Sequence, residues 1–299
     1  MRSFAIFLGL IALGLAGMAA LGYPAWLLIA PHIDNPKFHR VAGRVGMLIV
    51  AIGFLLVARR LKVADRHSLG YGLPAARFVV EVAKAIVLGT LLMMPALLTM
   101  IVFELRTGLD ESLAMGRWLH FVLGGLATGL VVAFIEETFL RGAMQTAIRR
   151  ESGAWLAILL PSLVYSATHF IGRYRLTAAD VHAGSGLDML AGTLILFAHP
   201  LDILDAFLCL TAVGILLGTV RELTGNIAAC IGLHASWVAV ISVVRDTTHR
   251  NPASPAHWLL SNYDGFVGWL VLGWTLAIGW SLWWWYGKRV ELFGRHQLH

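Results

Sequence analysis

Two adjacent carboxylates and a guanidinium interrupt an apolar segment of the chain. Glu136, Glu137 and Arg141 follow the run that begins at Val131. An ionised side chain near the centre of a bilayer costs about 2.5 to 3.5 kcal/mol on insertion scales, so unpartnered acids there are unfavourable. On a helix, residues four apart share a face, whereas neighbours diverge by about 100°. We therefore expect Glu137 to pair with Arg141 and Glu136 to face a cavity as a free base.

Two histidines interrupt later apolar segments in the same way. His169 ends the stretch PSLVYSATH, and His234 lies in GLHASW. Counted along helices from the basic residues that end each segment, their depths agree with that of Glu136 to within about 9 Å. Either histidine alone fits a hydrogen bond between packed helices equally well. Three polar side chains at matched depth favour a common site instead.

A buried glutamate beside two histidines has the chemistry of hydrolysis. Removal from water makes a carboxylate a stronger base, and an imidazole can orient the water that it deprotonates. The same side chains, Glu136, His169 and His234, could hold a divalent metal such as zinc with an open position. A glutamate mechanism needs no cofactor, and the sequence leaves both mechanisms open.

The elements that must position these side chains are membrane helices. The chain of 299 residues is 58% hydrophobic and 13% charged, which no soluble domain of this size could bury in one core. Apolar runs of about 17 to 25 residues can cross the hydrocarbon as helices. We expect an all-α, polytopic membrane bundle of about eight transmembrane helices. The predicted spans are 4–30, 43–58, 78–103, 118–148, 154–170, 203–220, 226–244 and 266–287.

The spans divide the chain into three predicted parts. Residues 1–117 are N-terminal transmembrane helices, 118–245 form the catalytic helical core, and 246–299 hold a loop and the C-terminal transmembrane helix. The irregular segment 171–202 surrounds one apolar run, which is typical of an interfacial or re-entrant helix.

The basic residues mark the ends of spans rather than a nucleic-acid surface. The loop 59–77 holds five basic residues against one acid, whereas 104–117 holds two against three. The positive-inside rule therefore places 59–77 and both termini in the cytoplasm. The predicted cytoplasmic side also includes Arg149, Arg150, Arg221, Lys288 and Arg289.

These features predict an integral membrane protein. Its expected partner is the lipid bilayer, and we expect no nucleic acid.

The three polar motifs together resemble those of the CPBP family of intramembrane proteases, which includes the type II CAAX prenyl endopeptidases and bacterial Abi-like proteins. That family has an EExxxR motif, an FxxxH motif, and a His followed four positions later by Asn or Asp, each on its own span. The first motif is complete here, the second has Tyr in place of Phe, and the third has Val238 at its polar position. The matching residues are Glu136, Glu137, Arg141, Tyr165, His169 and His234.

The resemblance implies an endopeptidase of a bacterial cytoplasmic membrane that hydrolyses a peptide bond in or next to the membrane. Its expected substrate is a membrane-anchored peptide or protein. Glu136 and His169 would activate water, His234 would help to hold the oxyanion, and Glu137 and Arg141 would support them.

Val238 leaves the polar position of the third motif open. A missing oxyanion donor costs on the order of a hundredfold in rate, so Ser236 or Asn226 could serve as a replacement. The alternative is a catalytically impaired scaffold or immunity-type membrane protein with the same fold. A transporter that relays protons through the buried acid is a third interpretation.

Overall fold

Long apolar helices build almost the whole structure. The computed structural model describes residues 1–108, 115–171 and 173–287. The helices are α1 (Arg2–Ile29), α2 (Phe38–Arg60), α3 (Ala75–Val102), α4 (Met115–Glu137), a π-helical segment (Thr138–Met144), α5 (Gln145–Thr168), α6 (Ser185–Ala198), α7 (Leu204–Thr224), α8 (Ala228–Thr247) and α9 (Trp269–Gly287). Short 3-10 turns occupy Ala30–His32, Ala178–Asp180, Pro200–Asp202 and His257–Leu259, and the strands β1 (Arg106–Gly108) and β2 (Thr248–Arg250) pair antiparallel. The predicted all-α fold is confirmed.

Six segments of the described chain are long and apolar enough to cross a membrane. They are Arg2–His32, Phe38–Arg60, Ala75–Val102, Met115–Thr168, Leu204–Thr224 and Ala228–Thr247. The single segment Met115–Thr168 contains the predicted span 118–148 and all but the last two residues of the span 154–170. The last predicted span, which corresponds to α9, is not among the six. The membrane bundle is therefore confirmed, with fewer qualifying segments than the eight predicted.

A backbone kink separates the two predicted spans that share this segment. Gly153 has a non-helical conformation inside α5, with φ 81° and ψ 176°. A Cβ atom placed there would meet nothing within 4 Å. The position therefore requires glycine for its positive φ and not for space. The predicted gap between residues 148 and 154 contains this kink.

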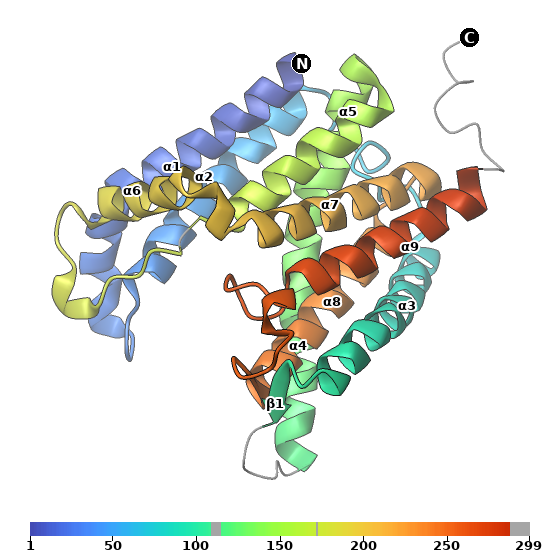
Figure 1. Ribbon diagram of the computed structural model, residues 1–299. Helices are drawn as coiled ribbons and strands as arrows, with labels where there is room; N and C mark the ends of the chain where they lie inside the picture. Colours follow the sequence, from blue (N-terminus) through green and yellow to red (C-terminus); the bar gives the residue numbers. More distant parts are fainter. Residues whose placement is uncertain (109–114, 172, 288–299) are drawn as a thin grey trace.

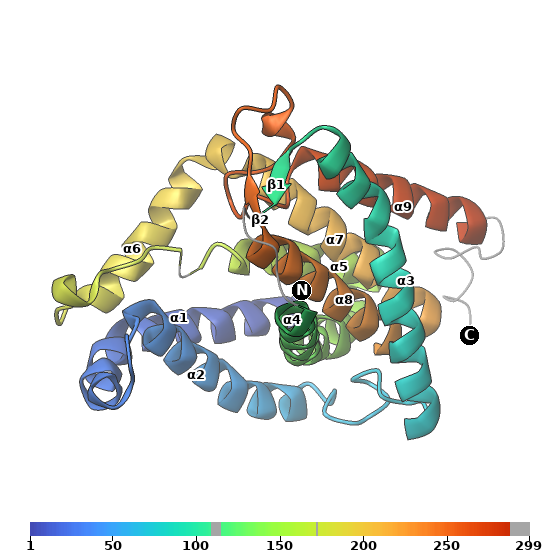
Figure 2. The ribbon, with the colours of Figure 1, turned by 90° about the horizontal axis from the view of Figure 1, so that it is seen from below.

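Two groups of helices lie side by side, with α1, α2 and α6 in one and α3, α4, α5, α7, α8 and α9 in the other (Figures 1 and 2). In the first group, Met189 of α6 packs against Met18 and Trp26 of α1 and against Phe38 of α2. At 14 residues, α6 is shorter than a span, as the sequence of 171–202 predicts.

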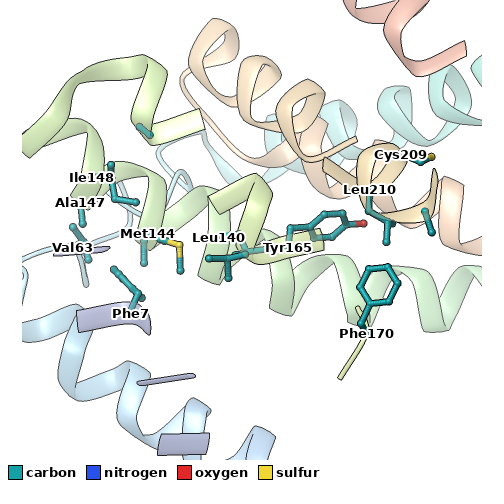
Figure 3. Close-up of a cluster of buried hydrophobic side chains, with 14 of the residues drawn as sticks. Phe7, Val63, Leu140, Met144, Ala147, Ile148, Tyr165, Phe170, Cys209 and Leu210 are labelled. Atoms are coloured by element: carbon teal, nitrogen blue, oxygen red, sulfur yellow. The ribbon is translucent and has the colours of Figure 1, made fainter. Parts of the chain in front are cut away.

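One hydrophobic cluster joins the two groups (Figure 3). It includes Phe7 of α1, Met144 of the π-helical segment, Tyr165 of α5 and Leu210 of α7. The cluster therefore fixes the position of the motif-bearing helices against the N-terminal helices.

Basic residues from three parts of the chain meet at one end of the helices. Arg150 donates hydrogen bonds to the Lys62 carbonyl (2.9 Å) and to Ser68 Oγ (2.7 Å), both in the loop between α2 and α3. Arg149 pairs with Glu222 near the end of α7.

The strands β1 and β2 lie at the other end of the helices, where β1 follows α3 and β2 follows α8 (Figure 1).

The prediction that the basic end of the helices faces the cytoplasm stays a prediction. The predicted loop charges within 109–114, and the pair Lys288 and Arg289, lie outside the described residues.

Candidate functional site

Glu137 and Arg141 form the buried ion pair that the sequence predicts. Arg141 Nη1 donates to Glu137 Oε1 at 3.0 Å, and the two side chains are 1% and 0% exposed. Arg141 Nη2 also donates to the carbonyl of Gly214 on α7 at 3.2 Å. A buried charge is tolerated only when it is paired and hydrogen-bonded, and this arrangement meets both conditions.

The pair lies where α4 changes into the π-helical segment. Glu137 is the last residue of α4, and Arg141 lies within Thr138–Met144. A π-helix accommodates an extra residue in one turn and occurs frequently at functional sites. The segment packs inward, because Leu140 to Met144 are all buried.

His234 lies between the two glutamates. Its Nδ1 is 2.8 Å from Glu137 Oε1, and its Nε2 is 3.9 Å from Glu136 Oε2. Since the carboxylate of Glu137 accepts the Nδ1 hydrogen, Nε2 is directed toward Glu136. When one ring nitrogen of a histidine donates a hydrogen bond to a carboxylate, that bond fixes the orientation of the ring and the direction in which the other nitrogen points.

Glu136 has the free carboxylate that the sequence predicts. Its side chain is 34% exposed, and Oε2 is buried without a hydrogen-bond partner among the described residues. The 3.9 Å separation from His234 Nε2 is too long for a direct hydrogen bond.

His169 ends α5 and is oriented by its own helix. Its Nδ1 is 2.7 Å from the carbonyl of Tyr165, which can only accept, so Nδ1 donates and Nε2 is left available. The Tyr165 ring lies 4.4 Å from the His169 ring and 5.8 Å from the His234 ring, measured between centroids. In the described structure, His169 makes no ion pair or hydrogen bond with Glu136.

A cavity of about 450 Å³ brings the two histidines together. Tyr165, His169, His234 and Val238 line it. Glu136, which the sequence predicts to face a cavity, is not among the residues that line this one. Most of the remaining wall is apolar and comes from α3, α7, α8 and α9. The cavity can therefore accept an amphiphilic molecule next to the imidazoles.

Two residues from irregular segments complete one side of this cavity. Tyr263 donates its hydroxyl to the His169 carbonyl at 2.7 Å, and the guanidinium carbon of Arg173 lies 3.5 Å from the centre of the Tyr263 ring. Burial raises the pKa of Tyr263, so its phenol stays protonated and able to donate. Neither residue belongs to the polar motifs, and no spacing in the sequence indicates their role.

Neither Ser236 nor Asn226 replaces the polar group that the third motif lacks at Val238. Val238 lines the cavity, but Ser236 donates to the Leu233 carbonyl (2.7 Å), and Asn226 accepts from the backbone of Ala228 (3.0 Å) in the turn before α8. Ser242, one helical turn beyond Val238, lines the cavity and was not expected.

The predicted metal ligands do not form a metal site in this arrangement. Among the described residues, no group of three or more His, Cys, Asp or Glu side chains could hold a metal ion. Zinc requires three or four such ligands at about 2.0 to 2.3 Å. Glu136 and His234 approach each other, but His169 does not join them, so the ligand set does not fit the ion.

Residues 117–240 match a protein family described as Type II CAAX prenyl endopeptidase Rce1-like. The matched range includes all three polar motifs and extends from α4 into α8. It confirms the resemblance to the CPBP intramembrane proteases and supports a protease-like function in the membrane. Comparisons with curated proteins and with solved structures gave no match.

Proposed function

We propose that this integral membrane protein, whose residues 117–240 match the Rce1-like family, is an intramembrane endopeptidase with Glu136 as its general base. The observation that supports this most directly is the free Glu136 carboxylate, 3.9 Å from an imidazole that the buried Glu137 holds in place. Its substrate is a membrane-anchored peptide or protein, because the cavity beside the histidines has mostly apolar walls.

In the proposed reaction, Glu136 takes a proton from a water that lies between it and the histidines. The resulting hydroxide attacks the carbonyl carbon of the scissile peptide bond. In this step His234 carries a proton on each ring nitrogen, so that Nε2–H donates to the oxyanion while Nδ1–H remains bonded to Glu137. His169 Nε2 orients the water or the peptide. Glu136 then returns its proton to the departing amine, so the reaction consumes one water and no cofactor.

A cleavage assay in liposomes tests the proposed base. The substrates are fluorogenic peptides with prenyl or acyl anchors, and the enzymes are the wild type, Glu136→Gln, His169→Ala and His234→Ala. We expect Glu136→Gln to lower kcat by about 10²-fold or more, because the amide cannot accept the proton. Glu81→Gln is the matched control, since Glu81 pairs with Lys84 on the surface of α3, away from the proposed site. Equal cleavage by wild type and Glu136→Gln would falsify the assignment.

A chelator added to the same assay distinguishes a glutamate mechanism from a metal mechanism. We expect unchanged cleavage after incubation with a strong zinc chelator, because Glu136, His169 and His234 do not form a ligand set. Inhibition that added zinc reverses would contradict the metal-free reaction while leaving the three residues in the site.

The second candidate function is a catalytically impaired membrane scaffold. The observation that favours it is Val238, which places an apolar side chain in the cavity wall where the family motif has a polar one. Cleavage of any anchored peptide that depends on Glu136 would decide in favour of the enzyme.

A further inference from the structure

A second cavity, of about 320 Å³, lies at the basic end of the helices. Three arginines line it, Arg149 and Arg150 from α5 and Arg221 from α7, together with Gln145 and Glu222. None of these residues lines the cavity of the proposed active site.

The one carboxylate of this group is already neutralised. Glu222 pairs with Arg149 at 2.5 Å and accepts a hydrogen bond from Gln145 Nε2 at 2.9 Å. An additional anion in the cavity would therefore meet little repulsion from Glu222.

Neither of the other two arginines forms an ion pair among the described residues, although the charge of Glu222 still acts on Arg221. Arg150 donates to the Lys62 carbonyl and to Ser68 Oγ. Arg221 Nε makes a long contact of 3.4 Å with the carbonyl of Arg141. Two guanidiniums that line one cavity without a carboxylate partner have the charge and the forked donors that bind phosphate.

The depth of the cavity agrees with the position of lipid phosphates. Its walls come from the loop after α2, which ends at Arg60, and from α7, which ends at Thr224. Headgroups lie just outside the hydrocarbon, where spans end. Basic pockets between transmembrane helices bind anionic lipid headgroups on the cytoplasmic side.

We propose that Arg150 and Arg221 form a binding site for a phosphate group, supplied by an anionic lipid headgroup or by a soluble phosphate. Gln145 is buried beside the two arginines and lines the same cavity. Phosphatidylglycerol has an anionic headgroup of the kind that this charge would bind. The Arg221 contact connects this site to the backbone of the π-helical segment.

Native mass spectrometry of the full chain in detergent tests the site. The protein is incubated with phosphatidylglycerol or with phosphatidylcholine, and the bound lipids are counted. We expect wild type to retain one phosphatidylglycerol in preference to phosphatidylcholine. Arg150→Gln and Arg221→Gln should each weaken that binding about tenfold, the effect of losing one charge-assisted hydrogen bond. Arg60→Gln is the matched control, because Arg60 is an exposed cation at the same end and lines neither cavity.

Inorganic phosphate distinguishes the two sources of the ligand. Displacement of phosphatidylglycerol by millimolar phosphate identifies a general phosphate site, and resistance to it identifies a headgroup site; both results support the proposal. Equal retention of the two lipids would overturn it. The proposal would also be overturned if Arg60→Gln and Arg150→Gln weakened phosphatidylglycerol binding equally, since binding would then depend only on net charge. Arg221→Lys, which keeps the charge, and gel filtration of every variant control for misfolding.

Discussion

Glu137 bonds to a cation and to an imidazole at once, and this leaves its neighbour free. Both Arg141 and His234 approach Glu137 Oε1, at 3.0 and 2.8 Å. Glu136, one residue earlier, points about 100° away on the helix and makes no hydrogen bond with its buried Oε2. The two acids therefore differ in environment although they are adjacent in sequence.

Val238 gives a prediction at the residue scale. We expect Val238→Asn to raise kcat by about tenfold or more, because the amide would add a donor to the cavity wall beside His234. The measurement is cleavage of an anchored peptide in liposomes, with Val238→Ala as a control for volume. An Asn variant no faster than the Ala variant would show that no donor is missing.

Spacing predicted the ion pair within one helix, and matched depth predicted that Glu136 and His234 share a site, but neither predicted which glutamate His234 would bond to. The Glu137–Arg141 pair follows from their separation of four residues. The bond from His234 to Glu137 joins α8 to α4, and helix packing of this kind has no signal in either segment alone. The same limit explains why Tyr263, 94 residues from His169, was not expected at the site.

At the scale of elements, the long segment Met115–Thr168 changes conformation twice. It is π-helical at Thr138–Met144, beside the ion pair, and it kinks at Gly153. The kink was predictable because polar residues and glycine interrupt the apolar run there. The π-helix was not, because an apolar run of this length has the same composition in either kind of helix.

Gly153 gives the prediction at this scale. We expect Gly153→Ala to lower the free energy of unfolding by about 1 to 2 kcal/mol, since an L side chain is disfavoured at φ 81°. Thermal unfolding in detergent measures the effect. Gly124→Ala, inside α4 and equally free of close neighbours, is the control and should be neutral or slightly stabilising. Equal effects at both positions would contradict the conformational explanation.

At the scale of the whole molecule, charge is unevenly distributed between the two ends of the helices. The loop after α2, the region of Arg149 and Arg150, and Arg221 meet at one end. The arrangement required for the predicted topology is thus present in the fold, while the orientation of the molecule in a membrane stays a prediction from the positive-inside rule.

Single cysteines introduced at the two ends test that orientation. Ala64, in the loop after α2, and Ala253, after β2, are both exposed, and the two native cysteines are buried. We expect a membrane-impermeant maleimide to label Ala253→Cys in intact cells and to label Ala64→Cys only after permeabilisation. The reverse pattern would place the basic end outside the cytoplasm.

The ion pair inside one helical segment also has a consequence for biosynthesis. Arg141 is made almost together with Glu137, whereas His234 follows 97 residues later. The segment can therefore enter the bilayer with Glu137 already neutralised, which lowers the cost of its insertion. The bond between Glu137 and His234 forms only when α8 arrives, so a chain truncated before α8 inserts without ever assembling the proposed active site.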